Sequence, residues 1–286
     1  MFAARKKTGT LLVRCPDRPG LIARITGFVA DHGGNIIEAE QHTDLQTGEF
    51  FQRVLFESDG FDVDEAGARA AFAPLAADLG AVSHLYLNPA PPRVAILASK
   101  STHCTVDLLH LWKTGDLNMV PVAIISNHTT NEEVAGWYDV PFHHMPVEAN
   151  PRQEHDVRAL LRGLDVDVVV LARYMRILSP EFCDEWAGRC INIHHSFLPA
   201  FVGADPYRQA YDRGVKMIGA TAHYVTADLD QGPIISQDTV AVSHRDTLDD
   251  IKRKGRELET DVLADAVAAH TEYRVITAGD RTVVFN

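Results

Sequence analysis

The sequence lacks most of the features that mark a secreted, membrane-spanning or nucleic-acid-binding protein. It has four cysteines in 286 residues and no CxxC pair, so we expect thiols in a reducing compartment rather than a disulfide framework. No apolar run approaches the roughly 20 residues that a helix needs to span a bilayer. The net charge of −12 speaks against the basic face of a general nucleic-acid binder. These absences favour a globular protein of the cytoplasm that binds neither membranes nor nucleic acids.

Cofactor motifs are missing as well. The sequence contains neither GxGxxG nor GxxxxGK[ST], so it offers no dinucleotide fingerprint and no P-loop. Fourteen histidines leave a metal site conceivable, but no HExxH or comparably tight ligand spacing occurs. We therefore expect neither a metal nor a prosthetic group.

A proline-rich stretch divides the chain. Pro89, Pro91 and Pro92 fall within four residues, and such a run can neither continue a helix nor stand in a central strand. Interpreted as a stiff linker over residues 89–92, it separates a domain of residues 1–88 from one of residues 93–286. A proline-rich loop inside a single domain is the alternative.

The first segment alternates strand-like and helix-like patterns. Apolar side chains recur at helical spacing over residues 20–32, and the pair Gly33-Gly34 ends this helix. An alanine-rich stretch over residues 66–79 predicts a second helix. The resulting order, βαββαβ, is that of a ferredoxin-like fold. The four predicted strands cover residues 10–15, 35–41, 50–57 and 82–87.

The second segment alternates continuously apolar strands with helices, which is typical of a parallel sheet covered on both faces. We therefore expect an α/β protein with an N-terminal ferredoxin-like domain and a C-terminal, mostly parallel, Rossmann-like domain. Later in the chain, two strand-like stretches flank a loop that contains Asp228 and Asp230. The predicted strands cover residues 93–98, 120–126, 166–172 and 190–194, and the predicted helices cover residues 106–114, 131–138, 156–164 and 180–186.

The most informative residues stand at the end of the last of these strands. Asn192 and His194 are two positions apart, so their side chains point the same way. Open α/β sheets bind ligands at the carboxyl ends of their strands. An amide can donate to a developing oxyanion, a histidine can move protons near neutral pH, and a loop carboxylate can orient that histidine. This set suits acyl chemistry, although a histidine with a purely structural hydrogen bond is the alternative.

At these residues the sequence resembles the folate-dependent formyltransferases. The resemblance rests on Asn192-Ile-His194, on the following Ser-Phe-Leu-Pro199, and on Leu229-Asp230-Gln-Gly232-Pro. It implies that Asn192, His194 and Asp230 form the catalytic trio, with 10-formyltetrahydrofolate as the folate substrate. Residues 171–178 resemble the loop that holds the pterin. The residues that the resemblance places against the substrate are Met175, Arg176, Ile177, Leu178, His195 and His223.

Two departures from the glycinamide ribonucleotide transformylases bear on the acceptor. The loop over residues 98–104 lacks the glycine with which those enzymes close on a phosphate, and His195 stands where they usually have proline. These features, with the N-terminal extension, resemble the formyltetrahydrofolate deformylases. The resemblance implies hydrolysis of 10-formyltetrahydrofolate to formate and tetrahydrofolate, which supplies formate for purine biosynthesis and balances the one-carbon folate pool. Formyl transfer to an amine is the alternative.

Two further interpretations remain open. His195 either holds the attacking water or makes a hydrogen bond one step removed from it. Arg173 or Arg176 either meets the glutamate tail of the folate or lies at the surface.

The turn Asp17-Arg18-Pro-Gly20 before the first helix is similar to an ACT domain. ACT domains bind small amino-acid effectors and pair their sheets between subunits. The resemblance therefore implies a homo-oligomer, a dimer or a tetramer, and an effector such as glycine or methionine. It places the effector at Asp17, Arg18, Gly20 and Asn35. A purely structural oligomerisation module is the alternative.

Overall fold

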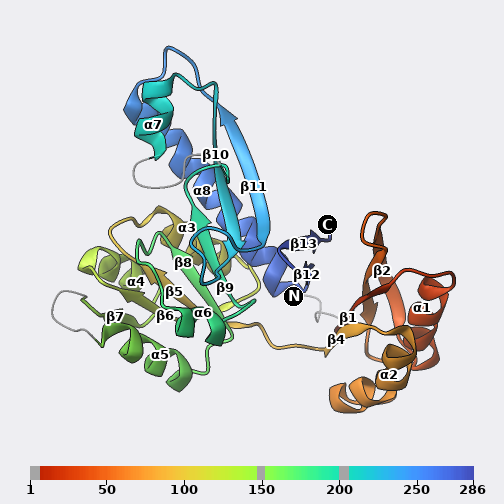
Figure 1. Ribbon diagram of the computed structural model, residues 1–286. Helices are drawn as coiled ribbons and strands as arrows, with labels where there is room; N and C mark the ends of the chain where they lie inside the picture. Colours follow the sequence, from red (N-terminus) through yellow and green to blue (C-terminus); the bar gives the residue numbers. More distant parts are fainter. Residues whose placement is uncertain (1–6, 147–151, 200–205) are drawn as a thin grey trace. The chain divides into compact units, whose positions relative to one another are not determined.

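The computed structural model describes residues 7–146, 152–199 and 206–286. The chain forms two compact units (Figure 1). The first extends to Ala90 and also includes Tyr273–Ala278 and Val283–Asn286, while the second comprises Pro91–Glu272 with Gly279–Thr282. Among the described residues, no helix combines the length and the apolar character that crossing a bilayer requires.

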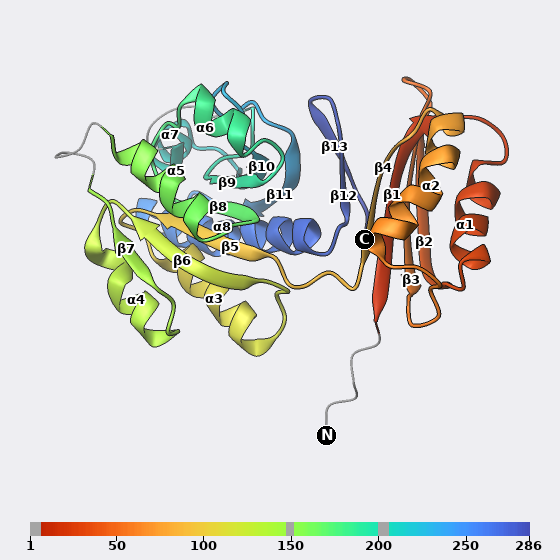
Figure 2. The ribbon, with the colours of Figure 1, turned by 90° about the horizontal axis from the view of Figure 1, so that it is seen from below.

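The first unit confirms the predicted βαββαβ order. Its four strands form an antiparallel sheet in the order β2-β3-β1-β4. Both helices pack on the same face of this sheet (Figure 2), where Ile25 and Phe28 of α1 and Phe72 of α2 contribute to one core. The elements are β1 (Thr8–Pro16), α1 (Leu21–Asp31), β2 (Asn35–Asp44), β3 (Glu49–Glu57), α2 (Glu65–Leu79) and β4 (Val82–Leu87).

The C-terminal residues depart from the predicted division of the chain, which assigned all of residues 93–286 to the second domain. The Tyr273 ring stacks on Tyr86 at 3.9 Å between centroids. Arg53 Nε donates to the Tyr273 carbonyl at 3.2 Å, and Arg14 Nη1 donates to the Thr277 carbonyl at 3.2 Å. These contacts join residues about 190 to 260 positions apart, which no local pattern reveals. The final hairpin consists of β12 (Val275–Ala278) and β13 (Arg281–Val284).

The second unit contains the expected, mostly parallel sheet. Its seven strands follow the order β11-β10-β9-β8-β5-β6-β7, and among the described residues the pairings of β10 with β9 and with β11 are antiparallel while the others are parallel. The strands are β5 (Arg93–Ala98), β6 (Val120–Ser126), β7 (Phe142–His144), β8 (Val168–Ala172), β9 (Cys190–His194), β10 (Met217–Tyr224) and β11 (Ile234–Ala241).

Helices cover both faces of this sheet (Figure 2). Val157 and Leu161 of α5 and Phe182 of α6 pack on one face against alternate residues of the buried strands. On the other face, α3 packs against α8, which also lies along β10 and β11. The helices are α3 (His103–Thr114), the 3-10 turn Thr129–Asn131, α4 (Glu132–Trp137), α5 (Gln153–Gly163), α6 (Pro180–Glu185), α7 (Pro206–Arg213) and α8 (Leu248–Thr271).

The long helix α8 is absent from the sequence-based prediction, although the sequence at its start forms a capping box. The Thr247 side chain accepts from the Asp250 backbone, and the Asp250 side chain accepts from the Thr247 backbone. This reciprocal capping box satisfies backbone N–H groups that the first helical turn leaves unpaired. The helix then runs for 24 residues and buries Leu258, Val262 and Val267.

Candidate active site

The structure brings the predicted trio together at the carboxyl end of β9. This strand lies between β8 and β10, and Asn192 pairs with His223 in the register of β9 with β10. Asn192 Nδ2 lies 3.2 Å from His223 Nε2. His194 is 6% exposed. The antiparallel return of β10 therefore places His223 beside the residues that the sequence pattern picked out.

Asp230 reaches the two histidines from the turn after β10. Its Oδ2 lies 3.2 Å from His194 Nδ1, and its Oδ1 lies 3.6 Å from His223 Nε2. Asp230 has a left-handed φ of 56°, a conformation that is uncommon for residues other than glycine but less so for aspartate. The turn can close because residue 232 is glycine, since a Cβ there would lie 1.7 Å from the Tyr224 carbonyl oxygen.

Hydrogen bonding selects a tautomer for His223. Its Nδ1 lies 2.9 Å from the Tyr224 carbonyl oxygen, which can only accept, so Nδ1 carries the proton. In the neutral ring Nε2 can accept from the Asn192 amide, and in the protonated ring it can donate to Asp230 Oδ1 at 3.6 Å. The Asn192 amide keeps its second N–H for a ligand. His223 is thus placed to orient Asn192.

His194 has one nitrogen engaged and one open. Its Nδ1 faces Asp230, and its Nε2 is buried without a hydrogen-bond partner among the described residues. Burial alone would raise the pKa of Asp230, but the interactions with His194 and His223 outweigh it and hold that pKa well below the usual range. Asp230 is therefore a carboxylate that can keep the His194 proton on Nδ1 and stabilise an imidazolium.

The His195 ring lies close to the rings of His194 and Tyr207. Its ring centroid is 5.3 Å from that of His194 and 5.8 Å from that of Tyr207. Burial and the nearby Arg173 charge lower the pKa of His195 to about 4. His195 is consequently neutral at pH 7 and can both donate and accept a hydrogen bond.

The predicted folate loop follows β8 and has no regular secondary structure. Arg173 and Met175 adopt positive φ angles of 61° and 57°. The side chains of Met175 and Ile177 are 64% and 75% exposed, whereas Leu178 packs partly against the core. Exposed apolar side chains in such a loop suit the face of a flat ligand. Arg176 lies between the two exposed residues.

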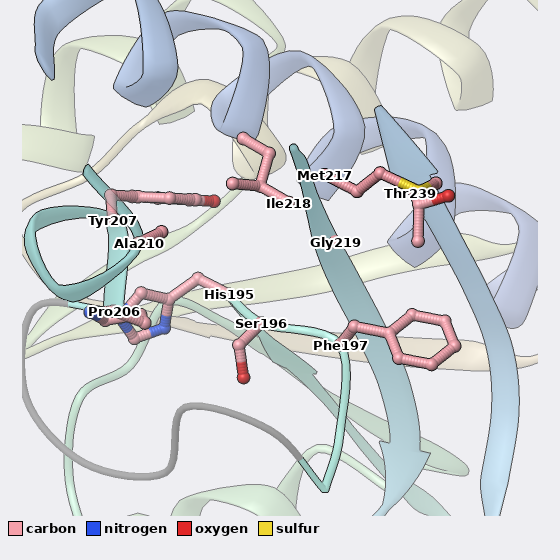
Figure 3. Close-up of a pocket in the computed structure, with 10 residues that line it drawn as sticks. All are labelled: His195, Ser196, Phe197, Pro206, Tyr207, Ala210, Met217, Ile218, Gly219 and Thr239. Atoms are coloured by element: carbon pink, nitrogen blue, oxygen red, sulfur yellow. The ribbon is translucent and has the colours of Figure 1, made fainter. Parts of the chain in front are cut away.

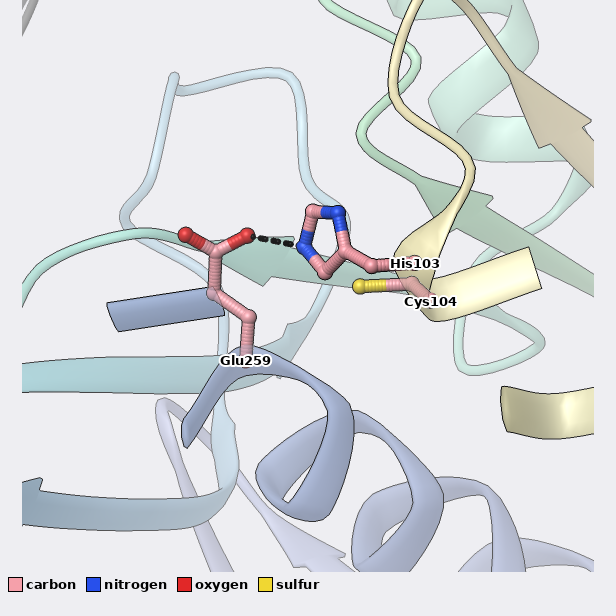
Figure 4. A group of neighbouring side chains, drawn as sticks. All are labelled: His103, Cys104 and Glu259. Atoms are coloured by element: carbon pink, nitrogen blue, oxygen red, sulfur yellow. Dashed lines mark hydrogen bonds and ion pairs between the residues drawn. The ribbon is translucent and has the colours of Figure 1, made fainter. Parts of the chain in front are cut away.

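A second polar cluster surrounds Glu259 of α8 (Figure 4). Donor atoms of His103, Cys104 and Glu259 lie within 4.8 Å of one another, which makes a metal ion conceivable there. However, His103 Nε2 lies 2.8 Å from Glu259 Oε2, and Arg173 and Tyr207 engage Oε1. Burial and the Glu259 charge raise the pKa of the Cys104 thiol well above its usual range. A metal would have to displace these partners and a proton, so the cluster fits an intramolecular network better.

An apolar cavity of about 480 Å³ lies next to this cluster (Figure 3). His195 and Tyr207 line one side of it, and Ile218 and Gly219 of β10 line another. A Cβ at residue 219 would lie 2.6 Å from Phe197 Cβ, so glycine is needed where the loop after β9 crosses β10. Sequence reasoning missed Tyr207 and Glu259, because neither belongs to a motif and their partners are distant in sequence.

The predicted effector residues lie in the first unit. Gly20 precedes α1 with a φ of 89°, and Asn35 begins β2. Arg18 Nη2 donates to the Asp78 carbonyl oxygen at 2.7 Å and pairs with its carboxylate at 3.2 Å. The Asp17 backbone N–H donates to the Gly48 carbonyl at 2.8 Å. These bonds fix the turn, and its binding of an effector stays a prediction.

The chain can now be compared with known proteins. Residues 92–267 match the formyl transferase family and residues 9–69 match the ACT domain, so the fold and the site define a formyl transferase with an ACT domain. The sequence is 47% identical over 280 residues to the formyltetrahydrofolate deformylase of Synechocystis sp., covering 97% of this chain and 98% of that protein. The chain belongs to the formyltetrahydrofolate deformylase family.

Solved structures agree with this placement. The crystal structure of a formyltetrahydrofolate deformylase from Pseudomonas syringae pv. tomato matches with a TM-score of 0.95 and 45% identity, covering 98% of this chain and 95% of that one. A glycinamide ribonucleotide transformylase from Symbiobacterium toebii matches with a TM-score of 0.67 and 32% identity, covering 71% of this chain and 98% of that one. The acceptor of the formyl group is therefore the question that the site must answer.

Proposed function

We propose that the protein hydrolyses 10-formyltetrahydrofolate to formate and tetrahydrofolate. The observation that carries this proposal is the geometry of His194. Its Nδ1 faces the Asp230 carboxylate at 3.2 Å, and its buried Nε2 has no partner among the described residues. Asn192 belongs to the same end of β9 as His194, and His223 of β10 orients its amide.

In this mechanism, a water molecule attacks the formyl carbon and gives a proton to His194 Nε2. The carbonyl oxygen becomes an oxyanion, which accepts a hydrogen bond from the Asn192 amide. Asp230 stabilises the imidazolium that forms. The bond between the formyl carbon and N10 then breaks, and His194 returns the proton to N10. The second proton of the attacking water stays on the released formic acid and passes to solvent when that acid ionises, so the products are formate, one proton and tetrahydrofolate.

The folate would lie against the loop that follows β8. The exposed side chains of Met175 and Ile177 offer an apolar face for the pterin, and backbone groups of the same loop can meet its polar edge. Arg176 can pair with a carboxylate of the glutamate tail. We assign the released formate to purine biosynthesis and the reaction to balance of the one-carbon folate pool in the cytoplasm.

The experiment that tests the reaction omits any amine. Purified protein is incubated with 10-formyltetrahydrofolate, and formate and tetrahydrofolate are measured together, with and without glycinamide ribonucleotide. We expect equal amounts of both products, and no acceleration by the ribonucleotide. Turnover that strictly requires the amine, with formylated ribonucleotide and no free formate, would show that the protein is a transferase. A folded His194→Ala variant is the control for background hydrolysis.

For the first unit, we propose that an amino acid, with glycine and methionine as first candidates, binds at the turn of Asp17, Arg18 and Gly20 or at the nearby start of β2 at Asn35, in a dimer or tetramer. Effector binding that changes turnover must be reciprocal with folate binding. Calorimetric titration against a panel of amino acids tests this proposal, and Arg18→Ala is the matched variant. No heat from any amino acid would leave the unit a scaffold.

A further inference from the structure

Glu259 is a buried carboxylate that the proposed mechanism does not use. It is 1% exposed, yet three donors surround it. His103 Nε2 lies at 2.8 Å, Arg173 Nη1 at 3.5 Å, and the Tyr207 hydroxyl donates to it as well. Burial opposes ionisation, but these partners outweigh it and lower the pKa of Glu259. The structure therefore keeps a fully partnered negative charge inside the second unit.

The three partners come from three neighbouring strand ends. His103 begins α3, which follows β5, and Arg173 follows β8 directly. Tyr207 belongs to α7, the first helix after β9. Because β5, β8 and β9 are adjacent and parallel, their carboxyl ends share one edge of the sheet. A single carboxylate on α8 thus contacts the segments that follow these three strands. Figure 4 shows its contact with His103.

Tyr207 connects this carboxylate to the trio. One turn before Glu259, a Cβ at Gly255 would lie 2.2 Å from Tyr207 Cζ, so the tyrosine ring rests on the bare backbone of α8. The same ring meets His195 at 5.8 Å and 61° between planes, and His195 meets His194 at 5.3 Å. The hydroxyl bond at one end and the glycine beneath the ring fix the position of Tyr207 in two independent ways.

We propose that Glu259 and Tyr207 are positioning residues that hold His195 against His194 and thereby close this side of the site to an amine acceptor. The proposal rests on the hydrolytic function proposed above and deepens it. Water needs only the space of one oxygen atom, whereas the attacking nitrogen of an amine acceptor carries at least one carbon substituent. A fixed wall can therefore discriminate against the amine by excluding it, without any favourable contact to water.

The two competing reactions differ only in the nucleophile. In hydrolysis, the water oxygen bonds to the formyl carbon, the carbon–N10 bond breaks, and N10 takes the proton. In the excluded reaction, the lone pair of a primary amine forms the new carbon–nitrogen bond, the same bond breaks, and the proton lost by the amine goes to N10. The product is then a formamide instead of formate, so the ratio of the two products reports directly on the wall.

The test measures this ratio with glycinamide as the amine. Glu259→Gln removes the charge, Tyr207→Phe removes the hydroxyl bond, and Gly255→Ala displaces the ring while leaving Glu259 in place. The matched control is Gly136→Ala, since a Cβ at this helical glycine would meet nothing within 4 Å. Each variant is incubated with 10-formyltetrahydrofolate and glycinamide, formate and N-formylglycinamide are quantified, and circular dichroism checks the fold.

We expect wild type and Gly136→Ala to release formate alone. Glu259→Gln and Gly255→Ala should lower kcat for formate release by on the order of 10-fold to 100-fold, as misplacement by about 1 Å does. Their KM should change little, and their ratio of formylglycinamide to formate should rise by at least about tenfold. Tyr207→Phe should change in the same direction by less, because its ring remains in place.

Two results separate the two proposals. If wild type releases no formate in the absence of glycinamide, the hydrolytic function fails at the first step. If wild type releases formate but the folded variants lose activity with an unchanged product ratio, the hydrolytic function stands and the positioning role of Glu259 and Tyr207 is overturned. Should Glu259→Gln or Gly255→Ala not fold, Tyr207→Phe decides, since phenylalanine keeps the ring and loses only the hydroxyl bond.

Discussion

Two carboxylates of the second unit contact histidines, and they differ in whether the histidine keeps a nitrogen open to a ligand. Asp230 stands in a turn and engages His194 and His223, and His194 keeps a buried nitrogen without a partner among the described residues. Glu259 stands in a helix, and its own two oxygens are taken up by His103, Arg173 and Tyr207. Asp230 can act on a ligand through the open nitrogen of His194. Glu259 has both oxygens engaged by side chains, so it can only hold its neighbours in place.

The largest effect that this contrast predicts is on turnover. Asp230→Asn should lower kcat by on the order of 10⁴-fold, because a neutral amide can support the wrong tautomer of His194. The fold should persist, since the amide has nearly the shape of the carboxylate. Formate release and circular dichroism together check this expectation. A folded Asp230→Asn protein with near-normal turnover would remove the distinction between the two carboxylates.

The amide beside His194 should matter next. Asn192→Ala should lower kcat by about 10²–10³-fold, the usual cost of losing one oxyanion donor, and leave KM nearly unchanged. Steady-state kinetics with 10-formyltetrahydrofolate measures both quantities. If KM rises while kcat stays the same, Asn192 binds the substrate equally in its ground and transition states and is not an oxyanion donor.

The free energy of unfolding should depend more on Glu259 than on an exposed carboxylate of the same helix. Glu259→Ala leaves the guanidinium of Arg173 without its partner and opens a cavity, so the free energy of unfolding should fall by about 3 kcal/mol. Glu257→Ala, two residues away on the exposed side of α8, should change it by less than about 0.5 kcal/mol. Urea titrations of the two variants provide the comparison. Equal losses would mean that Glu259 contributes no more than a surface residue.

The smallest expected effect is a dependence of the unfolding free energy on pH, and His195 causes it rather than Asp230 or Glu259. Both have lowered pKa values, so their contributions are lost only in acid below the usual carboxyl range. The pKa of His195 is lowered to about 4, so the unfolded chain takes up its proton first, and stability falls as the pH drops from about 6.5 towards 4.

His195→Asn tests this assignment. Between pH 7 and pH 5, wild type should lose about 1–2 kcal/mol more of its unfolding free energy than the variant does. His270, whose burial also lowers its pKa to about 4, contributes equally to both proteins and cancels in the difference. Urea titrations at the two pH values measure it. Parallel losses in the two proteins would show that His195 is protonated equally in the folded and unfolded states.

The site around Asp230 could be anticipated from the sequence, and the cluster around Glu259 could not. Asn192 and His194 alternate along one strand, so their shared direction follows from the period of a β-strand. The place of Asp230 came from the family resemblance. The role of His223 as the partner of Asn192 depends on the register between β9 and β10, which a single sequence does not state.

Glu259 shows why other parts of the structure could not be predicted from the sequence. It lies 156 residues from His103, in a helix whose charged residues look like those of an exposed face. Its burial depends on how α8 packs against α3 and β10, which is a tertiary property. The βαββαβ order of the first unit and the alternation of strands and helices in the second were predictable, because apolar periodicity is a local property of the sequence. The contacts of the C-terminal residues with the first unit were not predictable, because, like those of Glu259, they join residues that are distant in sequence.

The return of the C-terminal residues to the first unit makes the second unit an insertion within the first. The residues up to Ala90 leave the ribosome before the second unit, and Tyr273–Ala278 and Val283–Asn286, which belong to the same unit, leave it after most of the second unit. At about 5–20 residues per second, roughly 10–40 s separate the two portions during synthesis. The nascent first unit must therefore remain without these residues while the second unit is being made.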